Sequence, residues 1–550
     1  MLTLTSLAVA VFFFCYWRQS GSVPVTSDGA SNVLQAWAML HGNPGLHDWW
    51  VSDVSFYTTE LPQYMLIEAV LGLGPYVVNV AAAMTYTLLV LLAALLARGN
   101  AGGAGGLARA LLAGGIMLAP QLAATPILLN APDHTGTAVP LLATWLFLSP
   151  GGRTPPEAPP SRGDCPSPRA PLAPRAPLAP LAPLAPRAPC RRRPYPPRSS
   201  WLVVVTVGLA FAWTMVGDSV ILLTGIVPLI LVCSVRSLPG RVRSGPRWYE
   251  ASLAGAAAAA GVAGSFAPRI IAALGGYRER HVGTATDLGQ LPHGAWITVQ
   301  GLLELFGANV FAAGSAAGFV LALCHLAGVI AVACGLGIAV ARFSRSADLL
   351  VPVFAVAMVL NTGAYLISTH ARTVLGAREM AAVLPLGAVL AGRTLGEPVL
   401  AAVRARRRFR PALAVVCAGY LAGLGYGAAQ PSVLPADQPL AAWLVAHRLG
   451  DGLAGYWQAN STTLDSRRRV LVSAVTLDDH GRLVPYQWEA DDSDYDPARH
   501  YADFVVADGP AGLPGMQAAA TRTFGAPLRI YHADGYTILV WDANLLAGLG

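Results

Sequence analysis

The sequence predicts a polytopic α-helical membrane protein that ends in a small α/β domain. Of its 550 residues, 54% are hydrophobic and 12% are charged, and the mean hydropathy is +0.50. Soluble domains carry about 25% charged residues. Long apolar segments recur up to residue 429 and stop there. A chain of this length and composition cannot bury its apolar surface in one globular core, so lipid must form part of its solvent.

We expect eleven membrane-spanning helices, since a helix needs about 20 mostly apolar residues to cross a bilayer. The candidate segments are 1–17, 75–98, 106–125, 134–149, 201–216, 219–235, 250–273, 315–342, 349–368, 378–393 and 411–429. Together they make up a transmembrane domain over residues 1–429. The first segment is either an anchor or a signal peptide, although no small-residue cleavage site is obvious.

The distribution of Arg predicts which loops face the cytoplasm. The chain contains no Lys, so all 37 basic residues are Arg, which indicates a GC-rich bacterial genome. With a cytoplasmic N-terminus, every inner loop carries or borders on Arg, as the positive-inside rule requires. These loops lie near 99–105, 150–200, 236–249, 343–348 and 394–410. Arg18 is the exception. The sequence therefore predicts a multi-pass protein of the cell membrane with its C-terminal domain outside.

The cytoplasmic loop at 150–200 accounts for the basic character of the chain. It has nine Arg against Glu157 and Asp164, an excess of seven charges that equals the net charge of the whole protein, +7. This placement argues against a nucleic-acid-binding face. From Arg169 to Pro189 the loop repeats Ala-Pro-Leu and Ala-Pro-Arg, which predicts polyproline II or disorder and no catalytic role.

The seven Cys predict neither a zinc site nor a disulfide framework. Five lie in apolar segments, while Cys165 and Cys190 lie in the Arg-rich loop. No Cys-x-x-Cys pair occurs, and no Cys follows residue 430. The apolar ones are expected to be small buried side chains within helices.

Residues 430–550 predict an α/β domain on the outer face, because the apolar runs there shrink to strand length. Strands are expected at 471–477, 504–507, 528–531 and 536–541, and helices at 437–449 and 511–523. Asp534-Gly535 between the last two strands is a hairpin signal.

The first outer loop, residues 20–62, contains two groups of candidate functional residues. Ser27 and Asp28 precede an amphipathic stretch, so either could cap a helix, and Asp28 could also be a general base. Further along, aromatic and acidic residues form either an interfacial belt or a surface that suits a sugar. The residues of this second group are His47, Asp48, Trp49, Trp50, Asp53, Tyr57, Glu60 and Tyr64.

Other outer loops add acidic and basic candidates at the ends of helices. Asp133 and Asp218 could each cap the helix that follows, and His134 lies beside the first of them. Arg372 and Arg378 break the positive-inside trend, so they should have an anionic partner. Carboxylates that face Arg groups at one membrane level suit group transfer from a lipid phosphate, with a carboxylate as base and Arg stabilising the departing phosphate.

Three outer-loop motifs stand out, namely Ser27-Asp28-Gly29-Ala30, Leu61-Pro62-Gln63-Tyr64 and Pro132-Asp133-His134. These motifs and the layout of the chain resemble the GT-C superfamily of polyprenyl-phosphate-sugar-dependent membrane glycosyltransferases. Protein O-mannosyltransferases, aminoarabinose transferases and actinobacterial arabinosyl- and mannosyltransferases belong to this superfamily. Gly29 stands where better-known members often have a second acidic residue.

The resemblance implies an inverting transfer of a hexose or pentose from a polyprenyl phosphate to a glycan, lipid or protein acceptor outside the membrane. Asp28 would be the catalytic base, and Asp133 would support it or help bind metal or substrate. Arg372 or Arg378 would meet the lipid phosphate. The resemblance implies no certain cofactor beyond a candidate divalent cation, and the C-terminal domain would bind the acceptor.

Two other functions remain open from the sequence. A lipid or solute transporter or flippase would place ionisable or helix-breaking residues near the midplane, often in two related halves. The predicted helices here are mostly Ala, Leu, Val and Gly, and we see no internal repeat. A non-enzymatic cell-envelope assembly protein would instead act through its C-terminal domain.

Overall fold

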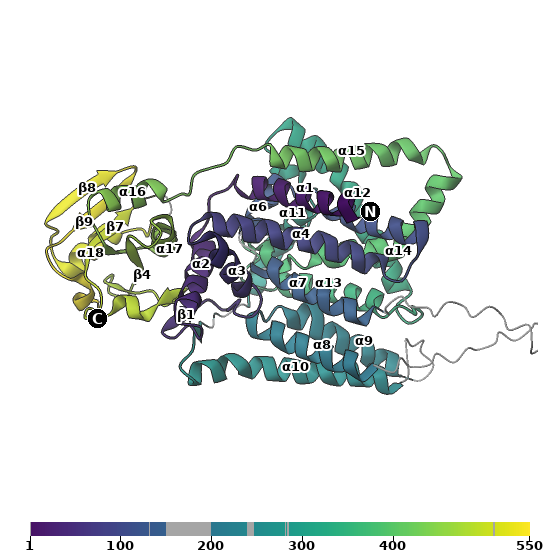
Figure 1. Ribbon diagram of the computed structural model, residues 1–550, viewed down its shortest axis with the longest axis horizontal. Helices are drawn as coiled ribbons and strands as arrows, with labels where there is room; N and C mark the ends of the chain where they lie inside the picture. Colours follow the sequence, from purple (N-terminus) through teal and green to yellow (C-terminus); the bar gives the residue numbers. More distant parts are fainter. Residues whose placement is uncertain are drawn as a thin grey trace, which may run out of the picture.

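A computed structural model of the chain shows a helical bundle with a small α/β domain at one end (Figure 1). It describes residues 2–130, 133–149, 200–238, 247–280, 282, 285–509 and 512–549. The predicted cytoplasmic tether and its Cys165 and Cys190 fall outside these ranges, as does Pro132. The end of the bundle beside the C-terminal domain is called the domain end below.

A helix lies at each of the eleven predicted segments. The bundle helices are α1 (Leu2–Ser20), α4 (Tyr76–Arg98), α5 (Gly103–Met117), α7 (Asp133–Leu148), α8 (Ser200–Gly217), α9 (Val227–Ser237), α10 (Arg247–Ala273), α12 (Ala316–Ala341), α13 (Leu350–Leu366), α14 (Val383–Ala405) and α15 (Phe409–Ala428). Six helices of the described chain are long and apolar enough to cross a membrane, or seven if a bent pair counts as one span. Length and composition therefore support a polytopic membrane protein with fewer clear spans than the eleven expected.

Two predicted helix boundaries were wrong for local reasons. The segment 106–125 is interrupted near Pro120, which cannot donate a backbone hydrogen bond. Beyond α5 the chain continues as the short helices η1 (Leu122–Ala124) and α6 (Thr125–Leu128), bent by 79°. The segment 378–393 begins with the 3₁₀-helix η5 (Val374–Met380), so α14 starts five residues later than expected.

Shorter helices and turns complete the bundle. They are α2 (Ser27–Leu40), α3 (Leu61–Leu71), the π-helix η2 (Leu222–Ile226), the 3₁₀-helices η3 (Leu288–Gln290) and η4 (Val310–Ala312), and α11 (Leu291–Leu305). The sequence suggested α2 through its amphipathic stretch, while α3 and α11 were not expected. Neither α3, with 11 residues, nor α11, with 15, reaches the length of a membrane span.

Contacts at each end of the bundle join segments that are distant in the sequence. At the far end, Arg393 of α14 pairs with Asp348 at 2.5 Å and donates to the Ser149 hydroxyl at 3.0 Å. At the domain end, the Phe56 amide donates to the carbonyl of Gly217 at 2.8 Å. In these two cases, segments that the sequence assigned to the same side of the membrane lie together.

Residues near the C-terminal end of helix α1 make specific contacts with the bundle. Tyr16 is fully buried, its ring packs edge-on against Tyr86 and its hydroxyl donates to the carbonyl of Leu118 at 2.8 Å. Arg18, the exception to the charge pattern, donates to the Ser432 hydroxyl at 3.1 Å in the linker that follows α15. The linker and the N-terminal helix are thus held together.

The C-terminal domain is built on a six-stranded mixed sheet in the order β5-β4-β3-β7-β9-β8. Its strands are β3 (Asp451–Ala454), β4 (Leu471–Leu477), β5 (Leu483–Pro485), β7 (Ala502–Asp508), β8 (Arg529–Ala533) and β9 (Tyr536–Val540). Its helices are α16 (Gln438–Ala446), α17 (Tyr456–Asp465) and α18 (Met516–Phe524), with 3₁₀ turns η6 (Asp492–Tyr495) and η7 (Leu545–Gly548). The four predicted strands, both predicted helices and the Asp534-Gly535 hairpin are present, while β3, β5 and α17 were not expected.

A second, three-stranded sheet joins the C-terminal domain to the bundle. Its central strand β1 (Trp49–Val51), from the first outer loop, pairs in parallel with β2 (Arg278–Glu279), which follows α10. On its other edge β1 pairs antiparallel with β6 (Ala490–Asp491) of the C-terminal domain. Figure 1 shows β1 and α2 at the junction between the two parts. This sheet fixes the domain over the end of the bundle.

Candidate functional site

Asp28 lies in the first turn of α2, but it does not cap the helix. The cap is Thr26, whose hydroxyl accepts from the Gly29 amide at 3.4 Å. Ser27 donates to the Tyr456 carbonyl at 2.6 Å. The prediction that Ser27 or Asp28 caps this helix was therefore wrong, because Thr26 one residue earlier already fills that position. The Asp28 carboxylate is left for contacts with other elements.

Arg378 joins two of the predicted acidic residues. Its Nη1 lies 2.9 Å from Asp28 Oδ2 and 3.5 Å from Asp133 Oδ2. Asp133 begins α7 with a positive φ of 29°, a strained backbone that Asp tolerates better than most residues. Three segments that are distant in sequence thus meet at the domain end, and the anionic partner expected for Arg378 is a pair of carboxylates.

The C-terminal domain adds two residues that the sequence did not suggest. The Tyr456 hydroxyl donates to Asp28 Oδ1 at 2.6 Å and is also hydrogen-bonded to Glu489. Glu489 is only 5% exposed, and burial raises its pKa well above the usual range, with the charge of Asp28 adding to the effect. No motif surrounds either residue, so only the docking of the domain reveals them.

A second group of ionisable residues lies around His134. Its Nδ1 is 2.7 Å from Asp218 Oδ2 and its Nε2 is 2.9 Å from Glu379 Oε2. A ring that donates from both nitrogens must be an imidazolium. Thr137 supports Asp218 with a hydrogen bond of 2.6 Å. Asp218 also accepts from the Val220 amide at 2.8 Å, which closes a turn before η2, but the N-cap of η2 is Ile221, so the predicted capping role of Asp218 was wrong.

Glu379 is held as a carboxylate by the positive charges around it. Burial alone would raise its pKa, but His134, His370 and Arg378 outweigh that effect and hold the pKa at about 2. His370 Nδ1 lies 3.8 Å from Glu379 Oε1. Because Glu379 neighbours Arg378 in η5, this short segment contacts both groups of acidic residues.

Glu60 and Asp53 lie close to these groups but make different contacts. Glu60 is fully buried and hydrogen-bonded to Thr59 and, at 3.3 Å, to Thr137. Burial raises the pKa of Glu60 well above its usual range, which disfavours the charged form that a cation ligand needs. Burial and the charge of Glu379 also raise the pKa of Asp53.

The groups around Arg378 and around His134 together form the acidic cluster. Trp49, Trp50 and Arg372 are not part of this cluster. The Trp50 indole donates to Asp492 at 2.8 Å, and Arg278 lies over its ring at 5.5 Å, so Trp50 serves the junction with the C-terminal domain. Arg372 is exposed, and its carbonyl lies 3.3 Å from His293 Nε2. Within the described ranges, the Arg372 side chain has no hydrogen bond or ion pair.

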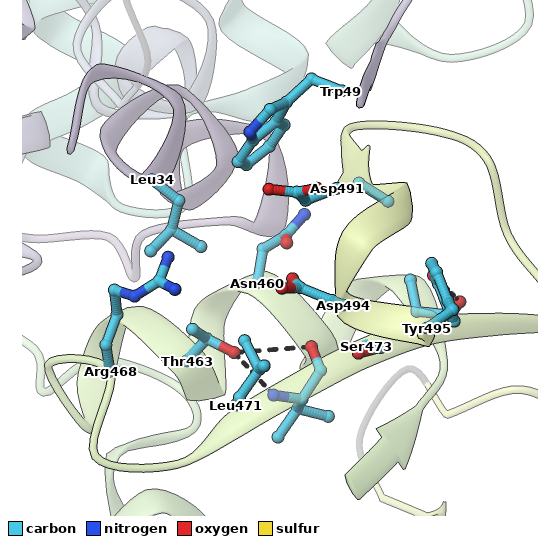
Figure 2. Close-up of a pocket in the computed structure, with 13 residues that line it drawn as sticks. Leu34, Trp49, Asn460, Thr463, Arg468, Leu471, Ser473, Asp491, Asp494 and Tyr495 are labelled. Carbon is cyan, nitrogen blue, oxygen red and sulfur yellow. Dashed lines mark hydrogen bonds between the residues drawn. The ribbon is translucent and has the colours of Figure 1, made fainter. Parts of the chain in front are cut away.

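Trp49 instead lines a small cavity between the first outer loop and the C-terminal domain (Figure 2). Asn460, Arg468, Asp491 and Asp494 contribute polar groups to it. Neither this cavity nor a second one beside His325 is lined by a member of the acidic cluster. The acidic cluster therefore lies beside the junction, outside both cavities.

The acidic groups do not form a cation site. Asp28 and Asp133 direct carboxylate oxygens at the guanidinium of Arg378, while Asp218 and Glu379 direct theirs at His134. Among the residues with described positions, no group of three or more His, Cys, Asp or Glu could hold a metal ion. The divalent cation suggested by the resemblance does not fit, because it would have to sit against existing positive charges.

The cavity in Figure 2 leads to a stability prediction for Asp494. Burial, and then the charge of Asp491, raise the pKa of Asp494 to about 7. Since this pKa is raised on folding, its stabilising contribution is present at low pH and is lost as the pH rises through about 7. Asp494→Asn should therefore raise the stability at pH 8 by about 4 kcal/mol and leave it nearly unchanged at pH 4.

Thermal unfolding of the detergent-solubilised full chain at the two pH values measures this difference. Asp479→Asn, an exposed change in the same domain, serves as the control. Equal effects of Asp494→Asn at both pH values would contradict the expected titration.

The comparisons with known proteins add no family assignment. No family model matches the chain, and no curated protein matches its sequence.

Proposed function

We propose that this protein transfers a sugar from a polyprenyl phosphate to an acceptor hydroxyl at the domain end of its membrane bundle, on the outer face of the membrane. The observation that carries the proposal is the meeting of Asp28, Asp133 and Arg378 from three separate segments. Paired carboxylates next to a fixed cation can activate a hydroxyl group and stabilise the charge that develops during transfer.

In the proposed step, Asp28 takes the proton of the acceptor hydroxyl as its oxygen bonds to the anomeric carbon. The bond between that carbon and the phosphate oxygen breaks, and the polyprenyl phosphate leaves with the electron pair. Attack from the face opposite the leaving group inverts the anomeric configuration. Asp28 suits this role because Arg378 and Tyr456 hold it as a carboxylate in a fixed orientation.

Arg372 suits the lipid phosphate better than Arg378 does. The guanidinium of Arg378 is already engaged by two carboxylates, so a phosphate would have to displace them. Arg372 is exposed, as are the apolar side chains of Ile367 and Leu375 on the same segment. A cation flanked by exposed apolar groups fits a headgroup whose chain lies in the bilayer.

The test is a transfer assay in membranes that contain the protein, with a panel of radiolabelled polyprenyl-phosphate sugars. We expect at least one donor to label an acceptor and the product to have the inverted configuration. Membranes carrying Asp28→Asn serve as the blank. Failure of every donor to give label above that blank would refute the proposal.

Arg372→Gln should raise the KM for the lipid donor about tenfold, the loss expected for one exposed charge-assisted contact. The turnover number should change much less, because Arg372 lies outside the acidic cluster. Kinetics at varied donor concentration separate the two constants. Arg269→Gln, near the C-terminal end of α10, is the matched control. A fall in turnover at unchanged KM would place Arg372 in the chemical step instead.

Proton-coupled transport is a second candidate, favoured by the buried groups around His134. Glu60, Thr137, Asp218 and His134 are linked by hydrogen bonds or ion pairs that continue to Glu379. Such chains can carry protons in transporters. Proton uptake into vesicles that depends on His134, together with no sugar transfer, would favour this function.

A further inference from the structure

We propose that the C-terminal domain completes the centre by supplying Glu489 as a neutral carboxylic acid that sets the basicity of Asp28 through Tyr456. The role of Asp28 as a base rests on the proposed function. The placement of the proton on Glu489 does not, because it follows from the hydrogen bonds.

Counting hydrogens shows that one carboxyl group must be protonated. The Tyr456 hydroxyl is hydrogen-bonded both to Asp28 and to Glu489. These two close oxygen contacts need two hydrogens, and a phenol supplies only one. The second hydrogen must therefore be on Asp28 or on Glu489.

The surroundings place that hydrogen on Glu489. Asp28 forms an ion pair with Arg378 at 2.9 Å, which favours its charged form. Glu489 is 5% exposed and has no ion pair in the described part of the chain. The charged and titratable groups that face it are Asp28, Asp133, Arg378, Tyr456 and Tyr486. Burial and the negative charges among them raise its pKa.

The backbone of Glu489 is held in one conformation by contacts on both sides. Its φ is +48°, in the left-handed region, and its carbonyl accepts from the Asn460 side chain at 3.1 Å. The next residue, Ala490, pairs with Trp50 in the sheet that joins the two parts. A strained position held by two separate contacts is typical of a functional site.

The order of donors follows from these placements. Glu489 donates to the Tyr456 oxygen, and Tyr456 donates to Asp28. The phenol thereby donates to the charged form of Asp28, while neutral Glu489 adds no second negative charge beside it. Tyr456 and Glu489 are positioning residues, since they act on the acceptor only through Asp28.

Infrared difference spectra of the purified full-length protein at pH 7 test the placement of the proton. The carbonyl band of a neutral carboxylic acid should be lost in Glu489→Gln and kept in Asp28→Asn. Loss in Asp28→Asn alone, or in neither variant, would overturn the assignment. The measurement needs no donor or acceptor, so it remains informative if sugar transfer fails.

The pH dependence of transfer tests the effect on Asp28. Tyr456→Phe should move the acidic limb of the rate profile to higher pH, because Asp28 loses a hydrogen bond to its charged form. Tyr501→Phe, at an exposed position of the same domain, is the control and should leave the limb in place. A lower melting temperature with an unchanged profile would mean that Tyr456 has only a structural role.

Discussion

Asp28→Asn is expected to slow sugar transfer by about 10³-fold, within the usual range for removal of a general base. Asn can still accept the hydrogen bond from Tyr456, so the orientation of the side chain should be kept. It cannot take a proton from an acceptor hydroxyl at neutral pH. Initial rates of label transfer at saturating donor measure the effect.

Two comparisons make this result specific. Asp287→Asn replaces an exposed carboxylate on another loop of the domain end and should retain the wild-type rate. The melting temperature of Asp28→Asn should remain close to that of the wild type, because Arg378 keeps its contact with Asp133. Full activity in Asp28→Asn would remove this residue from the mechanism.

His134→Leu is expected to destabilise the protein by about 3–5 kcal/mol, the usual cost of leaving buried charges without their partner. The imidazolium is 5% exposed and lies between Asp218, which is fully buried, and Glu379, which is 20% exposed. Leu fills a similar volume but leaves both carboxylates facing an apolar side chain. Thermal unfolding in detergent at pH 7 measures the loss.

The pH dependence of that loss tests its electrostatic origin. The pKa of Glu379 is depressed to about 2, so its stabilising contribution is present above its ordinary pKa and is lost as the pH falls towards 2. The difference between wild type and His134→Leu should therefore shrink below pH 4. His480→Leu, at an exposed site, should change stability by less than about 0.5 kcal/mol. A deficit independent of pH would indicate lost packing instead.

The sequence located the helices well because their signal is local. An uninterrupted apolar run such as 315–342 has one stable state in lipid, and α12 occupies Ala316–Ala341. Pro120 was visible in the sequence, but the 79° bend after α5 depends on how the following residues pack. The start of α14 was missed because Arg378 and Glu379 turn toward partners on other segments.

The candidate site was only half predictable. Asp28, Asp133 and Arg378 could be singled out because ionisable groups at helix ends are costly and need a reason. Tyr456 and Glu489 could not, because their role arises from the pairing of β1 with β6, which brings together residues more than 400 positions apart. Thr26, and not Ser27 or Asp28, caps α2. A difference of one residue at a helix start cannot be predicted from a sequence pattern.

The contacts of the N-terminal helix also determine what proteolytic processing would do to this protein. A signal peptidase cut after Ser20 would remove Tyr16 from the interior and free the post-α15 linker from Arg18. The Leu118 carbonyl would lose its donor, and one flank of α4 would open to lipid. Loss of residues 2–20 would therefore break the packing of Tyr16 against α4 and the hydrogen bond of Arg18 to the linker.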